Sequence, residues 1–240
     1  MYARGVCIAR VLRRSTLAQR RMNDHDPWQG PLPTLTGFGL VVAPLLVEHA
    51  AELLPFSPPE TFRYFNARPA DASLRAFRDF LDAGLADASR WAFIVRDAAT
   101  GAALGSSSFL DLRPAHRGLE IGCTWYAPAV RGTRVNPVCK FLLLEHAFGA
   151  MDAARVQLKC DDRNEHSKRA IARTGARFEG VLRKHMILPD GFVRDTAMFS
   201  IIREEWPTVR EGLVARAGGS SPQRPYHPGT HGDQCQSSRG

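Results

Sequence analysis

Apolar and polar positions alternate along residues 30–216 in a pattern that predicts one folded body of mixed strands and helices. Leu74, Phe77 and Leu81 recur at spacings of three and four, which is typical of an amphipathic helix over 73–88. The same criteria predict further helices at 45–54, 136–149, 164–174 and 204–215, and strands at 36–42, 91–96, 102–111, 119–126, 155–160, 178–188 and 192–202. Because helices separate only some of the strands, we expect a single α/β (α+β) domain with a mixed sheet.

Local signals mark the ends of several elements. Asn136 is expected to cap the helix over 136–149, whose first turn suits a proline. Asn164 is a good cap for the helix over 164–174, because its side chain can accept a hydrogen bond from the Ser167 amide. The turn at 189–191 joins the last two strands into a hairpin, which is also a candidate homodimer contact.

The two ends of the chain differ from this body. The net charge is +8, but residues 1–22 hold six Arg and no acidic residue, so the remainder is close to neutral at +2. A nearly neutral body disfavours a nucleic-acid-binding protein, although an RNA-associated role resting on the basic segment is an alternative. We interpret residues 1–29 as an extension that is disordered or not translated, with Met22 as the favoured start. Residues 217–240 are predicted to be a disordered tail rich in Gly, Ser and Pro.

Composition excludes some classes of protein. No apolar run reaches the roughly 20 residues of a membrane-spanning helix, so an integral membrane protein is excluded. The five Cys are dispersed and lack the spacing of a zinc site. This usage predicts reduced thiols in a cytoplasmic protein, with no metal bound.

The segment from Glu120 to Asn136 combines features of an anion-binding site. A strand ends in a loop where Gly132 lies between Arg131 and Arg134, and a helix follows directly. The free amides and the dipole of a helix N-terminus favour a negatively charged ligand. The loop lacks both the Gly-Lys-Ser/Thr of a P-loop and the Gly-x-Gly-x-x-Gly of a dinucleotide site. An ordinary strand-to-helix turn is the alternative explanation.

With three further motifs, the chain resembles the GNAT acyl-CoA N-acetyltransferase superfamily, particularly the branch of ribosomal-protein N-terminal acetyltransferases. The motifs, within 34–212, are Leu119-Glu120-Ile121-Gly122 leading to Trp125, the Arg131-Gly132 loop, 164–167 with 175–178, and 179–183. The resemblance implies a mostly antiparallel sheet flanked by helices, acetyl-CoA as donor and a primary amine as acceptor. The donor is expected in a V-shaped opening between the strands at 119–126 and 155–160.

The resemblance also implies which residues bind the donor. They are Trp125, Tyr126, Ala127, Arg131, Gly132, Thr133, Arg134, Val135, Asn136, Asn164 and Ser167. Two of them depart from the family loop Arg/Gln-x-x-Gly-x-Gly/Ala, because Arg134 and Asn136 stand at its last two marked positions. Glycine is favoured where backbone approaches a phosphate closely. We therefore expect Arg134 either to crowd the donor or to add charge at the pyrophosphate. An alternative function is a GNAT-fold protein that binds acyl-CoA or a partner without turnover.

Glu120 is the first choice for the general base, acting through a water. Strand alternation places Glu120, Gly122, Thr124 and Tyr126 on one face unless a bulge intervenes, so a carboxylate and a phenol would share the cleft. The structural alternative is a solvated charge at the strand end.

The remaining catalytic tasks are to stabilise the oxyanion and to protonate the thiolate. Backbone amides at 125–127 are the expected oxyanion donors. Ser167 and Tyr126 are equal candidates for the acid that protonates the departing thiolate. Their structural alternatives are an exposed helix hydroxyl and a tyrosine at the edge of the core.

The acceptor is left open by the sequence. A protein N-terminal α-amine follows from the resemblance, and its pKa of about 7.7–8.0 demands less of a base than a lysine near 10.4. A small amine, such as an antibiotic or a polyamine, is the alternative. His185 is a candidate for the acceptor pocket, Lys168 and Arg169 for the CoA phosphates, and His166 is expected to be exposed.

Overall fold

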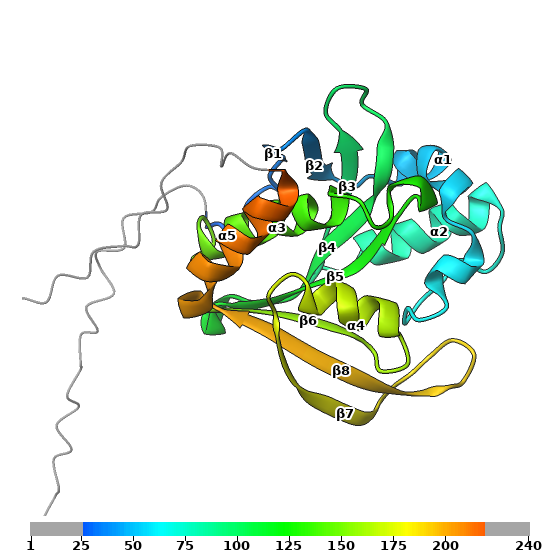
Figure 1. Ribbon diagram of the computed structural model, residues 1–240. Coiled ribbons are helices and arrows are strands. Elements are labelled where there is room, and N and C mark those ends of the chain that lie inside the picture. Colours follow the sequence, from blue (N-terminus) through cyan, green and yellow to red (C-terminus); the bar gives the residue numbers. More distant parts are fainter. Residues whose placement is uncertain (1–25, 219–240) are drawn as a thin grey trace, which may run out of the picture.

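The computed structural model describes residues 26–218, and these form one eight-stranded sheet in the order β1-β2-β3-β4-β5-β6-β8-β7 (Figure 1). The strands are β1 Leu35–Gly37, β2 Leu40–Pro44, β3 Trp91–Asp97, β4 Ala103–Arg113, β5 Gly118–Tyr126, β6 Arg155–Asp161, β7 Arg177–Ile187 and β8 Val193–Ile202. The helices are α1 Ala50–Leu53, α2 Leu74–Leu85, α3 Val135–Phe148, α4 Glu165–Ala172 and α5 Trp206–Ala217. Of the predicted disordered ends, residues 1–25 and 219–240 lie outside the described residues. Residues 26–29 are ordered instead, because Trp28 packs in the core and its Nε1 donates to the Met151 carbonyl at 2.8 Å.

Three elements differ from the sequence predictions. The single strand expected at 36–42 is a hairpin, because Phe38 and Gly39 both have positive φ and turn the chain between β1 and β2. The helix expected at 45–54 is broken into short 3-10 segments on either side of α1. Asn136 is not a helix cap: α3 begins at Val135, and the cap position is held by Arg134, whose side chain makes no capping hydrogen bond.

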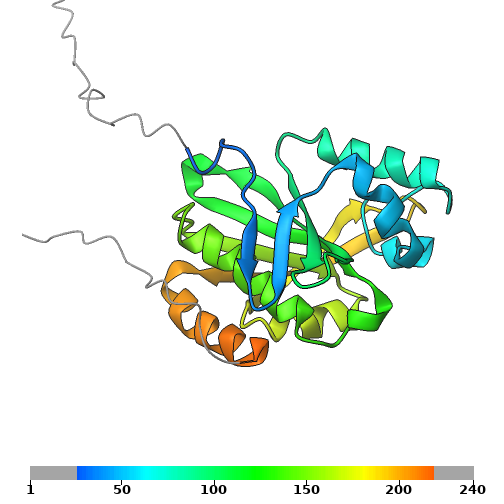
Figure 2. The same ribbon diagram turned by 90° about the horizontal axis from the view of Figure 1, so that it is seen from above.

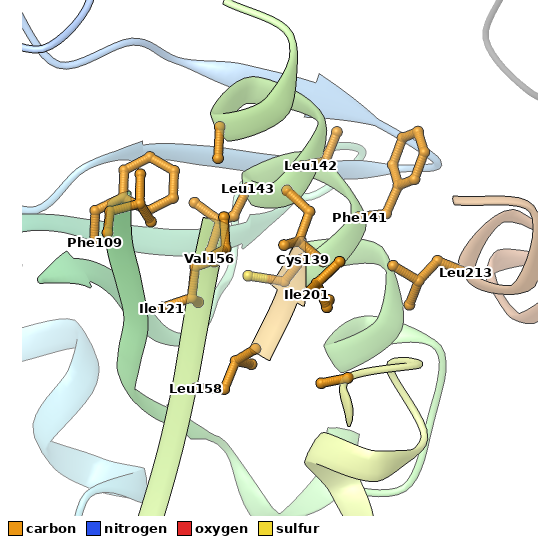
Figure 3. Close-up of a cluster of buried hydrophobic side chains, with 14 of the residues drawn as sticks. Phe109, Ile121, Cys139, Phe141, Leu142, Leu143, Val156, Leu158, Ile201 and Leu213 are labelled. Carbon is orange, nitrogen blue, oxygen red and sulfur yellow. The ribbon is translucent and has the colours of Figure 1, made fainter. Parts of the chain in front are cut away.

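Helices lie on both faces of the sheet (Figure 2). An apolar cluster fills the space between the helices and the sheet on each face. Alternate residues of β3 belong to different clusters: Phe93 and Val95 pack on the side of α3, α4 and α5, whereas Ala92 and Ile94 pack on the side of α1 and α2. Figure 3 shows the first cluster, in which side chains of α3 and α5 meet strand residues such as Phe109. The domain is therefore a three-layer structure with the sheet in the middle.

The sheet opens in its centre, between β5 and β6. All neighbouring strands are antiparallel except these two, which are parallel and pair at Gly118↔Arg155, Leu119↔Val156 and Glu120↔Gln157. Beyond Glu120 the strands diverge, although β5 continues to Tyr126. This divergence produces the V-shaped opening that the sequence motifs predicted.

Candidate active site

A cavity of about 1640 Å³ fills the opening between β5 and β6. Its walls come from both faces of the sheet, within the described part of the chain. The loop before α3 and the start of α4 line it on one side, and the segment at 60–90, which contains α2, lines it on the other. One continuous space therefore passes between the two strands. A ligand entering beside α3 can meet a second ligand entering beside α2.

On the α3 side, the loop at 131–134 lines the cavity. Arg131 Nε donates to the Tyr126 carbonyl at 2.9 Å, which folds the loop back onto β5. Gly132 has a φ of +76°, and a Cβ built there meets no atom within 4 Å. Glycine is thus required by the backbone conformation and not by lack of space.

The amides of this loop divide into two groups. The Thr133 amide donates to the Val130 carbonyl and the Val135 amide to Thr133 Oγ1, so both are engaged by the loop itself. Within residues 26–218, the amides of Gly132, Arg134 and Asn136 have no protein acceptor. They lie at the positive end of the α3 dipole, which makes them suitable donors to a phosphate.

The Arg134 side chain contacts the β1–β2 turn, whereas the sequence suggested that it would either crowd the donor or add charge at the pyrophosphate. Its Nη1 donates to the Phe38 carbonyl, and its guanidinium packs over Gly39 in the β1–β2 turn. In this conformation Arg134 ties the start of α3 to the first hairpin. Its backbone still contributes an amide to the loop.

The start of α4 forms the other wall on this side. Asn164 Oδ1 accepts from the Ser167 amide at 3.0 Å, which confirms the predicted cap and leaves Nδ2 for a ligand. The Ser167 hydroxyl lies beside the Cys160 thiol. Lys168 pairs with Glu165 at 2.6 Å and with Asp162 at 3.2 Å, so its charge is already partly balanced. His166 is exposed, as expected.

Glu120 lies at the vertex of the opening, the last position where β5 and β6 pair. Its side chain is buried, so the alternative of a solvated strand-end charge is wrong. One carboxylate oxygen, Oε2, lies 2.8 Å from Lys159 Nζ and 3.3 Å from Gln157 Nε2. The carboxylate is therefore held in one place by two groups of the neighbouring strand.

Tyr126 does not share a face with Glu120. At the bulge, Cys123 and Thr124 oppose the single residue Ser107, and Cys123 has a φ of +47°. The extra residue reverses the alternation of the strand. Consequently Trp125 faces the α1–α2 cluster, whereas Tyr126 packs under α3 with its hydroxyl beside the Cys139 thiol. Burial there raises the pKa of Tyr126 well above its usual value.

Hydrogen bonding between β4 and β5 reduces the number of backbone amides that are available as oxyanion donors. The Ala127 amide donates to the Leu104 carbonyl at 2.8 Å. It is therefore not available as an oxyanion donor, contrary to the sequence prediction. Successive residues of an antiparallel strand direct their amides to opposite sides, and Tyr126 pairs with Gly105. The Tyr126 amide therefore points away from β4 and toward the side from which β6 has diverged. Of the three predicted amides, this one fits the task.

Sequence reasoning missed several charged side chains that are buried around the cavity. They are Lys140 of α3, Asp161 of β6 and Arg194 of β8. Asp161 is bound by Arg163, and Arg194 donates to the Tyr64 carbonyl and to Asn66 Oδ1. A signal existed for Lys140, because it is the one charged residue in the apolar run 138–144.

His185 lies near this charged group from the β7 side. Its pKa is lowered first by partial burial and then by the charges of Lys159 and Arg194, while Glu120 acts in the opposite direction. The imidazole is therefore neutral at pH 7. His185 is exposed on β7 and is not among the residues that line the cavity, so the structure does not place it in the acceptor pocket.

Comparison with known proteins identifies the family. A family model described as an acetyltransferase (GNAT) domain matches residues 40–177, more than half of the chain. The chain belongs to the GNAT acetyltransferase family. A protein from T. thermophilus assigned as an acetyltransferase is 36% identical with a TM-score of 0.73, and the match covers 78% of this chain and 98% of that one. None of the curated proteins compared with the chain matches it.

Two further solved structures extend the likeness to the GNAT fold. A GCN5-related N-acetyltransferase from Brucella melitensis is 28% identical with a TM-score of 0.73, over 79% of this chain and 87% of that one. RimJ from Mycobacterium smegmatis, solved with CoA-disulfide, is 22% identical with a TM-score of 0.64, over 80% and 96% of the two chains, and shows the fold alone.

Family membership makes the protein an acetyl-CoA-dependent N-acetyltransferase, which confirms the family and the fold predicted from the motifs. Across the described helices, none combines the length and the apolarity needed to cross a bilayer.

Proposed function

We propose that this GNAT domain transfers the acetyl group of acetyl-CoA to the α-amine of a polypeptide by direct attack. The observation that carries the proposal is the continuous cavity between β5 and β6, with free loop amides on one side and buried Glu120 at its vertex. The donor would enter from the α3 side and the amine from the α2 side. Their reacting atoms would meet where the strands diverge.

The donor side is suited to a phosphorylated thioester. The amides of Gly132, Arg134 and Asn136 would bind the pyrophosphate at the start of α3. Asn164 Nδ2 would donate to a carbonyl of the pantetheine arm, since Oδ1 already accepts from the Ser167 amide in the cap. The Tyr126 amide would donate to the carbonyl oxygen as it becomes an oxyanion.

On the acceptor side, Glu120 would take the proton of the attacking ammonium through a water. The neutral amine nitrogen then forms a bond to the carbonyl carbon and releases its second proton to water. The C–S bond breaks with its electron pair going to sulfur, which takes up a proton. An α-amine with a pKa of about 7.7–8.0 is partly neutral at pH 7, so a carboxylate already paired with Lys159 is a sufficient base.

The charges beside the vertex favour a singly charged acceptor over a polyamine. Each buried carboxylate has a cationic partner: Lys159 lies 2.8 Å from Glu120, and Arg163 contacts Asp161 through two hydrogen bonds. On the α2 wall, Glu60, Asp71, Asp79 and Asp87 are matched in number by Arg63, Arg68, Arg75 and Arg90, so no excess of negative charge is left there to attract a polycation. A single ammonium needs only the local hydrogen-bond acceptors.

The first test is titration calorimetry with acetyl-CoA and with free CoA. We expect saturable one-to-one binding of both; absence of binding at millimolar concentrations would instead support a GNAT-fold protein that has lost its donor site.

The second test compares three acceptors under one set of conditions. They are a peptide with a free N-terminus, the same peptide with an acetylated N-terminus and an internal lysine, and spermidine. Acetylation of the first peptide alone supports the proposal, and preferred acetylation of spermidine contradicts the proposed acceptor.

A further inference from the structure

Lys140 is a buried cation that the catalytic scheme above does not use. It belongs to α3, and 5% of the residue is exposed. Its Nζ donates to Thr124 Oγ1 at 2.9 Å, and within the described residues this is the hydrogen bond that the ammonium makes. Burying an ammonium with so few partners is unfavourable, so the folded protein maintains this charge at a cost in stability.

The surroundings of Lys140 form a polar strip at the bulge of β5. Thr124 Oγ1 also lies 2.7 Å from Ser107 Oγ, and both belong to the bulged part of the β4–β5 pair. The strip lies between apolar residues of α3 and the open side of β5. The cavity reaches it, since both Thr124 and Lys140 line the wall.

Lys140 also lies on the path that the donor would follow. It is five residues after the start of α3, which corresponds to roughly 7 Å along the helix axis from the loop amides. Its charge interacts with Glu120 at the vertex. A thioester that is anchored at the loop and reaches the vertex therefore passes the ammonium with its sulfur end.

Resting on the proposed function, we propose that the Lys140 ammonium contacts the sulfur of CoA and gives it a proton as the thiolate leaves. The C–S bond breaks with its electron pair on sulfur, an Nζ–H proton moves to that sulfur, and Lys140 becomes a neutral amine. The second proton, which the amine nitrogen releases to water after it bonds to carbon, restores the Lys140 ammonium, and the first proton leaves Glu120 for the solvent. The acetylated amine and neutral CoA thiol are the products, so charge and protons balance.

The acidity of Lys140 matches this task. Burial lowers the pKa of Lys140 from its usual value to about 8, while the neighbouring Cys139, Cys123 and Glu120 act in the opposite direction. A thiol titrates near 8.5, so the proton is transferred between groups of similar affinity, which is the favourable condition for general acid catalysis. Lys159 also faces this region, but its ammonium is paired with Glu120.

The two acids considered from the sequence fit this task less well. The Tyr126 hydroxyl lies under α3 against Cys139, and the pKa of the phenol is well above 10. The Ser167 hydroxyl lies beside the Cys160 thiol and carries no charge that could stabilise a thiolate. Lys140 combines a positive charge with a proton of suitable acidity.

The test titrates the thiol of free CoA bound to the whole protein, using the ultraviolet absorbance of the thiolate. We compare the wild type with Lys140→Met, Lys140→Gln and Lys140→Arg, and use Lys184→Met, an exposed lysine of β7, as the control. In the wild type and in the control we expect the thiol pKa to fall by about one unit below that of free CoA, a tenfold change in proton affinity. The Met and Gln variants should lose this shift, and the Arg variant should retain it.

Transfer kinetics provide the second readout. In Lys140→Gln, which keeps a hydrogen bond to Thr124, kcat should fall by about 10²-fold while the KM for acetyl-CoA changes little. An unshifted thiol in the wild type, or a shift that survives in Lys140→Gln, overturns the role of Lys140 and leaves the proposed function intact. Failure of CoA to bind the wild type overturns both.

Discussion

The two sides of the cavity are built from different parts of the chain. The proposed donor side is formed by short local segments: the backbone of the loop at 131–134 and the Asn164 cap at the start of α4. The vertex uses buried charged side chains from distant elements, with Glu120 of β5 against Lys159 of β6 and Lys140 of α3 behind the bulge. The first side depends on local conformation, and the second on how strands and helices pack.

This difference separates binding from chemistry. Backbone amides at a helix start offer partial charges that do not change with pH, which suits a phosphate group that is charged throughout the physiological range. Proton transfer needs groups that titrate, and burial at the vertex holds such groups close together. Substitutions on the donor side should therefore change affinity, and those at the vertex should change kcat.

The sharpest test of this division is Glu120→Gln. We expect kcat to fall by about 10²-fold, because the amide cannot accept the proton, while the KM for acetyl-CoA stays close to the wild-type value. Glu179→Gln is the matched control, since Glu179 pairs with Arg155 on the surface of the same sheet. A large rise in the KM for acetyl-CoA with kcat preserved would mean that Glu120 contributes to donor binding, and it would contradict the proposed separation of binding residues from catalytic residues.

The sequence predicted best the local structure that depends on residues close together in the chain. The Asn164 cap and the loop before α3 follow from residues close together in the chain, so local rules find them. The pair of Glu120 with Lys159 depends on the register of β5 and β6, which no local pattern contains. The reversal of Tyr126 depends on one extra residue at Cys123, and nothing in the alternation of the strand indicates it.

A donor-side test with a smaller effect is Gly132→Ala. The φ of +76° is unfavourable for alanine by about 1 kcal/mol. The loop should therefore shift, its amides should no longer point at the pyrophosphate, and CoA binding should weaken about fivefold. Gly101→Ala in the β3–β4 turn is the control, because its φ of +73° and open surroundings impose the same strain far from the loop. Equal CoA affinity in both variants, measured by calorimetry, would show that the loop conformation does not matter for binding.

Removal of the α4 cap should affect stability and binding together. Asn164→Ala should lower the free energy of unfolding by about 1 kcal/mol and also weaken CoA binding, since the same side chain supplies Nδ2 to the donor. Ser73→Ala removes the equivalent cap of α2, where Ser73 Oγ accepts from the Ala76 amide at 3.1 Å. Chemical denaturation should give similar losses for both, with CoA affinity reduced in the first variant and unchanged in the second. If Ser73→Ala weakened CoA binding as much as Asn164→Ala does, the loss of affinity would reflect a general destabilisation of the fold and not a contact of Asn164 with the donor.

The smallest expected effect is that of Tyr126→Phe, and it bears most directly on the vertex. The hydroxyl lies on the α3 face beside Cys139, while the proposed oxyanion contact is made by the backbone amide, which phenylalanine keeps. We expect kcat to change by less than about twofold and the free energy of unfolding by about 1 kcal/mol at most. Steady-state kinetics across pH provide the measurement. A loss of kcat as large as that of Lys140→Gln, together with disappearance of the alkaline decrease in the pH–rate profile, would identify the Tyr126 phenol as the general acid. The proton would then come from the core beneath α3 and not from the cavity wall.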